Sequence, residues 1–342
     1  MIKTVGIVSL SSGIIGEDFI RFEVEIGLRR LHEYGLTVKF MPNARKGIDY
    51  IRDHPEKRAE DLLQAFRDPE IDMILCAIGG DDTFRLLPYL FDHNELRDAV
   101  SQKVFLGFSD TTINHFMLHK LGLRTFYGQS FLADICELGS QMLPYSRKYF
   151  EELISTGRIC EIVPSETWYE ERKSFTPDQV GTERISHPDR GFELLQGLPA
   201  FSGKILGGCI DSIYDFFSEE RYADMPLLCE KYQLFPGREE WKDRILLLES
   251  SEEKMSPGKY RKALEHLKKA GVFDAVSGVL VGKPMDEAYA QEYKQHLVDV
   301  IGNPQLPVLC NLHIGHAAPR CIIPFGVEAF VDAEKQLIRF AD

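Results

Sequence analysis

The first half of the chain alternates apolar runs typical of buried strands with stripes typical of amphipathic helices. Strands are predicted at Thr4–Leu10, Leu36–Met41, Ile71–Ile78 and Val104–Phe108. Helices are predicted at Phe19–Tyr34, Ala59–Phe66, Thr83–Leu87 and Ile113–Leu121, and Pro88 is expected to bend or end the third. The nearly continuous apolar run Ile71–Ile78 is expected of a strand covered on both faces. This alternation predicts a parallel, Rossmann- or flavodoxin-like α/β sheet with right-handed crossovers.

The second half contains a further set of strand-like apolar runs after a polar stretch. Residues 165–190 are rich in Glu, Arg, Pro, Ser and Thr and show little periodicity, as in a linker or a functional loop. Further strands are predicted at Arg244–Leu248, Val276–Val281, Pro307–Leu312 and Cys321–Phe325, followed by a hairpin at Phe330–Phe340. A helix over Lys259–Ala270 should start with Ser256 as N-cap and Pro257 in its first turn. We therefore expect an N-terminal α/β domain (1–164), a polar linker or substrate loop (165–202) and a second, smaller α/β domain (203–342).

Composition and charge narrow the classes of function. The 342 residues suffice for two domains, and 44% of them are hydrophobic, as in a globular protein. The formal net charge of −13 disfavours binding to nucleic acid or to an anionic membrane surface. The seven cysteines are scattered without a C-x-x-C pair, which favours a reducing compartment over a disulfide framework. The sequence shows no signal-peptide pattern and no apolar stretch of about 18 residues, so the expected location is the cytoplasm.

Neither a metal nor a cofactor is expected. His115 and His119 stand at positions i and i+4 of one predicted helix, but no Glu completes a zinc-binding H-E-x-x-H motif. The chain also lacks the nucleotide-binding fingerprints G-x-G-x-x-G and G-x-x-x-x-G-K-[ST]. A Rossmann-type nucleotide enzyme is therefore a disfavoured alternative.

Two glycine-containing segments follow predicted strands of the first domain, at the end of the sheet where ligands bind in open α/β folds. In the segment 107–110, Ser109 stands at a helix N-terminus, as in a nucleophile elbow, although Thr111 replaces the second glycine of G-x-S-x-G. Capping of the helix by Ser109 or Asp110 is the alternative. Gly79-Gly80 can present backbone N–H groups to an oxyanion or a phosphate, or can simply form a tight turn.

The second domain supplies candidate carboxylates and imidazoles. Glu249 closes the apolar strand Ile245–Leu248, and His313 and His316 flank Ile314-Gly315 after a later strand. Taken singly, each is equally explained as a solvated side chain at a strand end or in a loop. Taken together, Ser, Glu and His occur in the chain order of α/β-hydrolase triads, an order that any long chain also contains by chance.

Blocks of sequence from about residue 70 to 326 resemble, in the same order, the LD-carboxypeptidase family of serine peptidases. The blocks are Ala77–Leu90 (AIGGDDTFRLLPYL), Gly107–Thr112 (GFSDTT), Thr125–Gly128 (TFYG), Gly203–Cys209 (GKILGGC), Ile245–Glu249 (ILLLE) and Gly315-His316 with Pro324–Gly326. The resemblance implies a triad in which Ser109 is the nucleophile, His316 the general base and then acid, and Glu249 the group that orients the imidazole. It also implies an oxyanion hole made by backbone N–H groups of Gly79, Gly80 and Asp110.

Two departures from the family pattern leave alternatives for the triad. The family often has a second acidic residue directly after the catalytic Glu, whereas Ser250-Ser251 follow Glu249, so Glu252 or Glu253 could take its place. His313 is close enough in sequence to compete with His316, although only His316 has the Gly-His step.

The polar stretch bears on the substrate. Ser165–Trp168 (SETW) resembles an insertion of the microcin C self-immunity peptidases, a branch in which a Trp stacks on the nucleotide part of the substrate. Trp168 is accordingly a candidate substrate-binding residue, with a partly buried loop anchor as the alternative.

The resemblance implies a cytoplasmic serine carboxypeptidase or amidase, and a homodimer, that acts through an acyl-enzyme in a cleft between the domains. The expected substrate is the L,D-peptide bond of a murein tetrapeptide, with release of D-alanine. The alternative is an immunity-like peptidase that cleaves aminoacyl-nucleotide amides. A non-catalytic small-molecule binder on the same fold is the hypothesis from another class.

Overall fold

The computed structural model describes residues 1–341, which form two compact units of nearly equal length. The first unit contains residues 1–158 and 172–183, and the second contains residues 159–171 and the chain from 184 onward. The polar stretch is thus divided between the units. Among the described residues, no helix combines the length and the apolar composition that crossing a bilayer requires.

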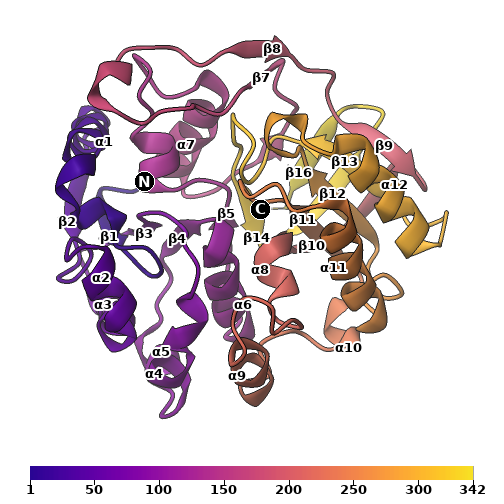
Figure 1. Ribbon diagram of the computed structural model, residues 1–342, viewed down its shortest axis with the longest axis horizontal. Helices are drawn as coiled ribbons and strands as arrows, with labels where there is room; N and C mark the ends of the chain where they lie inside the picture. Colours follow the sequence, from indigo (N-terminus) through magenta and orange to yellow (C-terminus); the bar gives the residue numbers. More distant parts are fainter. Residues whose placement is uncertain (342) are drawn as a thin grey trace. The chain divides into compact units, whose positions relative to one another are not determined.

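The first unit is built on a parallel sheet in which the strands follow the order β2-β1-β3-β4-β5 (Figure 1). The strands are β1 (Thr4–Val8), β2 (Thr37–Phe40), β3 (Met73–Cys76), β4 (Val104–Gly107) and β5 (Thr125–Tyr127). The helices are α1 (Arg21–Glu33), α2 (Ile48–Asp53), α3 (Pro55–Arg67), α4 (Leu87–Phe91), α5 (Glu95–Ala99), α6 (Thr112–Lys120) and α7 (Pro144–Thr156). This strand order is that of flavodoxin-like sheets, so the predicted fold class is confirmed.

The core of this unit explains why its elements could be predicted from sequence. All four residues of β3 are buried, as expected of a central parallel strand. Helix α3 buries Leu62, Leu63 and Phe66 on one face. The helix predicted at Thr83–Leu87 ends before Pro88, as expected, and Pro88 lies in the first turn of the next helix, α4, where a helix does not need the missing N–H group. The short 3-10 helix η3 (Thr83–Leu86) leads directly into α4.

The second unit contains a mixed sheet with the order β6-β16-β15-β10-β11-β12-β13-β9. Its strands are β6 (Glu161–Ile162), β9 (Glu193–Gln196), β10 (Ala200–Cys209), β11 (Arg244–Glu249), β12 (Gly278–Gly282), β13 (Val308–Leu312), β15 (Glu328–Asp332) and β16 (Leu337–Phe340), and the unit also contains β7 (Thr167–Tyr169), β8 (Ser186–Pro188) and β14 (Ile323–Phe325). The helices are α8 (Ile210–Tyr214), α9 (Met225–Lys231), α10 (Arg238–Trp241), α11 (Pro257–Lys269) and α12 (Ala290–Ile301). Strands β10 to β13 are parallel, and the remaining neighbours in this sheet are antiparallel.

The predicted strands of this unit are confirmed at β11, β12, β13 and β14, whereas the long strand β10 was not predicted. The predicted cap of α11 is confirmed, because the Ser256 side chain accepts a hydrogen bond from the backbone N–H of Lys259. The C-terminal hairpin is confirmed as β15 and β16. Strands β7, β8 and β9 lie in the segment 165–202, which was predicted to be a linker or loop. They were missed because none of them has the apolar alternation of a core strand.

Strands β10 and β11 approach each other so closely that Gly207 has no room for a side chain. Its φ of +141° lies in a region that L-residues rarely adopt. A Cβ atom there would lie 2.0 Å from the carbonyl oxygen of Leu247 on β11. Because that atom belongs to the backbone of a central strand, no side-chain rotation relieves the overlap.

Gly207→Ala should therefore lower the free energy of unfolding by about 2 kcal/mol or more. Gly258→Ala, at a helical position with nothing within 4 Å of the new Cβ, is the matched control and should be neutral or slightly stabilising. Urea unfolding followed by circular dichroism measures both. Equal unfolding free energies for the two variants would contradict the packing described for β10.

Candidate active site

Ser109 occupies a strained turn between a buried strand and a helix of the first unit. Strand β4 ends at Gly107, and the 3-10 turn η4 (Ser109–Thr111) leads into α6. The φ of Ser109 is +66°, a left-handed conformation that is costly for a residue with a side chain. Ser109 is partly exposed, whereas its neighbours Phe108 and Asp110 are buried. This is the strand–turn–helix geometry of a nucleophile elbow.

The predicted glycine turn packs directly against this serine. A Cβ atom on Gly79 would lie 2.6 Å from Cβ and 2.8 Å from Oγ of Ser109, and 3.2 Å from the backbone N of Asp110. Gly80 has a φ of +147°, and a Cβ there would lie 2.4 Å from Oγ of Ser11. The structure thus brings the Gly79-Gly80 backbone, the Ser109 hydroxyl and the Asp110 amide into one small region.

The Asp110 side chain forms hydrogen bonds with segments on either side of the glycine turn. Its Oδ2 accepts hydrogen bonds from Ser11 Oγ (2.6 Å) and from the backbone N–H of Thr83 (2.9 Å). Burial raises the pKa of Asp110 to about 6, against these hydrogen bonds. Phe108 and Thr111 hold the N-cap positions of η4 and α6, so the alternative in which Ser109 or Asp110 caps the helix is wrong.

In the second unit, Glu249 and His316 form a buried hydrogen-bonded pair. Glu249 is the last residue of β11, and its side chain is fully buried. Its Oε2 lies 2.7 Å from Nδ1 of His316 and accepts a second hydrogen bond from the His316 backbone N–H (3.2 Å). Because an ionised carboxylate only accepts hydrogen bonds, Nδ1 carries the proton and Nε2 is the nitrogen left for chemistry.

Gly315 makes this pairing possible. Its φ is +79°, and a Cβ atom there would lie 2.2 Å from both Cδ and Oε2 of Glu249. The buried Arg320 holds the loop by donating hydrogen bonds to the carbonyl oxygens of Gly315 and His316. The Gly-His step noted in the sequence is therefore a packing requirement of the carboxylate beside it.

A second carboxylate contacts the other ring nitrogen of His316. Oε2 of Glu252 lies 3.0 Å from Nε2, and the Glu252 side chain is 60% exposed whereas that of Glu249 is buried. Burial alone would lower the pKa of His316, but the two carboxylates raise it to about 10. The hydrogen bond to His316 lowers the pKa of Glu252 to about 2. His316 is therefore an imidazolium in this arrangement.

His313, the competing histidine, lies in a different environment. It is fully buried, and its Nε2 is 3.5 Å from Oδ2 of Asp189. Burial opposes the charge on Asp189, but its contacts with His313 and Lys283 hold its pKa at about 2. Of the candidates in this unit, the structure pairs His316 with Glu249 and Glu252 and pairs His313 with Asp189.

The side chains around Glu249 favour a protonated thiol and a hydrogen bond over the binding of a metal ion. Cys209 Sγ, a Glu249 oxygen and a His316 ring nitrogen lie within 4.8 Å of one another, so they could in principle hold an ion. Burial and the neighbouring Glu249 raise the pKa of the Cys209 thiol well above its ordinary value, and a thiol must lose its proton to bind metal. The Glu249–His316 hydrogen bond already uses one atom of each of the other two residues.

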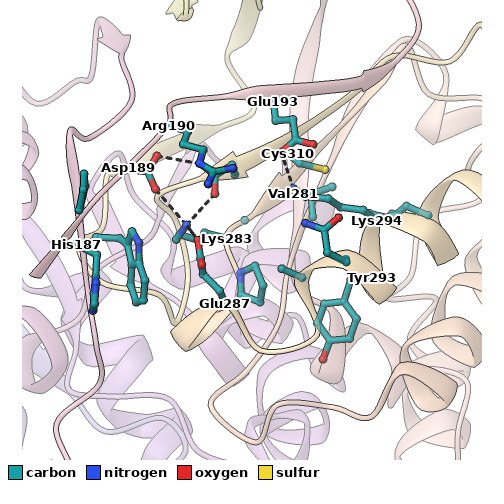
Figure 2. A pocket seen from close by; sticks show the side chains of 18 residues that line it. His187, Asp189, Arg190, Glu193, Val281, Lys283, Glu287, Tyr293, Lys294 and Cys310 are labelled. Atoms are coloured by element: carbon teal, nitrogen blue, oxygen red, sulfur yellow. Dashed lines mark hydrogen bonds and ion pairs between the residues drawn. The ribbon is translucent and has the colours of Figure 1, made fainter. Parts of the chain in front are cut away.

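Trp168 lies on β7 and borders a pocket of about 450 Å³ within the second unit. Figure 2 shows this pocket from close by, with His187, Asp189 and Lys283 among its labelled lining residues. The indole stacks on His187 of β8, with ring centroids 4.4 Å apart, and Lys283 Nζ lies 5.1 Å from its centroid. Lys283 is buried and forms ion pairs with Asp189 (3.1 Å) and Glu287 (2.5 Å), with Asn311 Oδ1 also within hydrogen-bond distance. The pocket combines an aromatic wall with fixed charges, as small-molecule sites do.

Sequence comparison identifies the family. The profile of the LD-carboxypeptidase N-terminal domain matches residues 5–128, and that of the C-terminal domain matches residues 202–331. The chain belongs to the LD-carboxypeptidase family. It is therefore a peptidase, as the resemblance noted in the sequence implied.

Relatives within the family have different names. An MccF-like protein from Streptococcus pneumoniae, solved in complex with AMP, is 60% identical, with a TM-score of 0.99 over 100% of this chain and 99% of that one. A probable murein peptide carboxypeptidase of Bacillus subtilis is 25% identical over 92% of this chain and 86% of its own. The Escherichia coli microcin C7 self-immunity protein MccF is 24% identical over 84% of this chain and 78% of its own length.

Two features of this LD-carboxypeptidase family member were missed by the sequence analysis. The pocket beside Trp168 was not predicted, although Lys283 directly after the apolar strand β12 was a possible signal. The contact of Glu252 with Nε2 of His316 was also missed, since Glu252 was considered only as a substitute for Glu249. Both depend on loop conformations that no local pattern specifies.

The raised pKa of His316 predicts a pH dependence of stability. A group with a higher pKa in the folded than in the unfolded state stabilises the fold fully below the unfolded value, here about 6.5, and this stabilisation is lost as the pH rises through about 10. The free energy of unfolding should fall across this window by about 1.5–3 kcal/mol, the range for hydrogen bonds to charged groups. Urea titrations at pH 6 to 10 measure it.

His316→Gln should remove this part of the pH dependence. His32→Gln, at an exposed position of α1, is the control and should keep the wild-type profile. Identical pH profiles for wild type and His316→Gln would contradict the assignment of the titration to the pair of carboxylates around His316.

Proposed function

We propose that the chain is a serine peptidase or amidase with Ser109 as nucleophile, His316 as general base and Glu249 as the orienting carboxylate. The observation that carries the proposal is the 2.7 Å contact between His316 Nδ1 and Glu249 Oε2, because it leaves Nε2 as the nitrogen that can take a proton. The positive φ of Ser109 supports the role of nucleophile. The proposal requires both units to present these groups to one substrate.

Each proton transfer in the proposed reaction has a named donor and acceptor. Ser109 Oγ attacks the carbonyl carbon of the scissile amide and passes its proton to Nε2 of His316. The backbone N–H groups of Gly79, Gly80 and Asp110 are the proposed donors to the oxyanion. His316 then donates the proton to the leaving nitrogen, and water hydrolyses the acyl-enzyme by the same route. Glu249 stabilises the imidazolium while it exists.

For the substrate, we favour an amide between an aminoacyl group and a nucleotide-like leaving group. Trp168 and the adjacent 450 Å³ pocket offer an aromatic platform for a base. The relative that is 60% identical over the whole chain was solved with AMP, which supports a nucleotide-binding role for this chain as well.

A murein tetrapeptide is the second candidate substrate. Its support is the similarity to the probable murein peptide carboxypeptidase of Bacillus subtilis. Cleavage of its L,D-peptide bond would release D-alanine and would use the same three catalytic groups.

We also propose a cytoplasmic location and a homodimer for this protein. The seven cysteines are free and six of them are buried, which suits the reducing conditions of the cytoplasm. The homodimer rests on the family resemblance alone.

Ser109→Ala should abolish cleavage of both an aminoacyl sulfamoyl adenosine and a murein tetrapeptide, with a loss of about 10³-fold or more in kcat. The measurement is product release by mass spectrometry, together with covalent labelling by a fluorophosphonate probe mapped to the modified peptide. Ser11→Ala, a serine near the same glycine turn, is the control and should still be labelled at residue 109. Turnover by Ser109→Ala, or labelling at another serine, would rule out the assigned nucleophile.

Trp168→Ala should separate the two substrates. Stacking of a base on an aromatic side chain is worth about 1–3 kcal/mol, so KM for the aminoacyl sulfamoyl adenosine should rise about tenfold or more, while KM for the tetrapeptide should stay unchanged. Trp168→Phe keeps an aromatic face and should retain most of the affinity. Equal changes for both substrates would show that Trp168 supports the loop and does not bind a base.

A further inference from the structure

His316 lies between two carboxylates that differ in their freedom to move. Glu249 ends a central strand and is buried, whereas Glu252 stands in the turn after β11 with 60% of its side chain exposed. The contact between Glu252 Oε2 and His316 Nε2 is 3.0 Å long. Rotation of the Glu252 side chain would end this contact without disturbing the buried pair.

The contact with Glu252 prevents His316 from acting as a base. Ionised carboxylates donate no hydrogen bonds, so both ring nitrogens must carry protons when each faces one. An imidazolium has no lone pair to accept the proton of Ser109. Catalysis by the proposed triad therefore requires that Glu252 leave Nε2.

The cations near Glu252 already have carboxylate partners of their own. Lys254 pairs with Asp286 at 2.7 Å. Arg221 lies 3.7 Å from both Asp215 and Glu253. Arg221 also acts on Glu252 through its charge, but His316 is the residue that pairs directly with the Glu252 carboxylate. A cation brought by the substrate would therefore compete with His316 for this carboxylate.

From these contacts we infer that Glu252 selects substrates with a free ammonium group next to the scissile amide. Such a group pairs with the Glu252 carboxylate and draws it away from His316. The Nε2 proton, no longer held by an anion, passes to solvent, and the imidazole becomes the base that the reaction needs. The inference rests on the proposed function and specifies its substrate class.

This selection distinguishes the two candidate substrates. An aminoacyl nucleotide carries a free α-ammonium group on the carbon beside the scissile carbonyl. In a tetrapeptide, the α-nitrogen of the corresponding residue is part of a peptide bond and has no charge. Glu252 thus favours an aminoacyl amide over the C-terminal peptide bond of a tetrapeptide, where the corresponding α-nitrogen is acylated.

The test compares two substrates that differ only at this nitrogen: an aminoacyl sulfamoyl adenosine and its N-acetyl derivative. Wild-type enzyme should cleave the free amine with a kcat/KM about fivefold higher, the upper end of the range expected for one partly exposed charge contact. In Glu252→Gln the ratio should fall towards one, partly because the N-acetyl substrate is cleaved faster than by wild type. Structural damage would not produce such a gain.

Glu253→Gln is the matched control. It removes one negative charge from the adjacent residue, whose side chain is 63% exposed and pairs with Arg221 rather than with His316. It should keep the wild-type ratio. Glu252→Ala should behave like Glu252→Gln, and thermal melting should show that all variants are folded.

The outcomes separate the inference from the function on which it rests. If wild type and Glu252→Gln show the same ratio, or if Glu253→Gln changes it as much, the role of Glu252 is overturned while the peptidase activity stands. If wild-type enzyme cleaves neither substrate nor a murein tetrapeptide, the proposed function fails and the inference fails with it.

Discussion

The chemistry of the second unit depends on one buried hydrogen bond, between Glu249 and His316. A carboxylate without exposed surface is costly unless hydrogen-bond donors satisfy it, and Glu249 receives the ring and backbone N–H groups of one residue. The pair fixes the orientation of the imidazole and leaves the identity of its second partner open. In this structure, that partner is the exposed Glu252.

Close approach of the backbone shapes the surroundings of both His316 and Ser109. Gly315 lets the loop before His316 lie against Glu249, and Gly79 lets a turn lie against Ser109. At each position a side chain would overlap the functional group itself. The glycines therefore place backbone and reactive atoms at distances that no other residue type permits. Ser109, which packs against Gly79, is itself strained, since it is a non-glycine residue with a positive φ.

The polar stretch has more structure than its composition indicates. Trp168 and His187 face each other across β7 and β8, and the Tyr169 N–H donates to the carbonyl of Ala318, in the loop that follows His316. Asp189 is almost fully buried against Lys283. Charged residues that look solvent-exposed in sequence thus line the pocket of the second unit, and a backbone hydrogen bond connects the hairpin to the loop after His316.

The sequence alone determined the α/β class, most of the parallel strands of each unit and the residues Ser109, Glu249 and His316 as candidates, because apolar periodicity and short motifs are local properties. It could not choose between His313 and His316 as the partner of Glu249, or detect the polar strands β7 to β9. Only tertiary structure placed His313 beside Asp189 and gave Nε2 of His316 a second carboxylate. Those pairings join residues far apart in the chain through loop conformations and burial, and the electrostatics of a histidine depends on what folding brings to each of its two nitrogens.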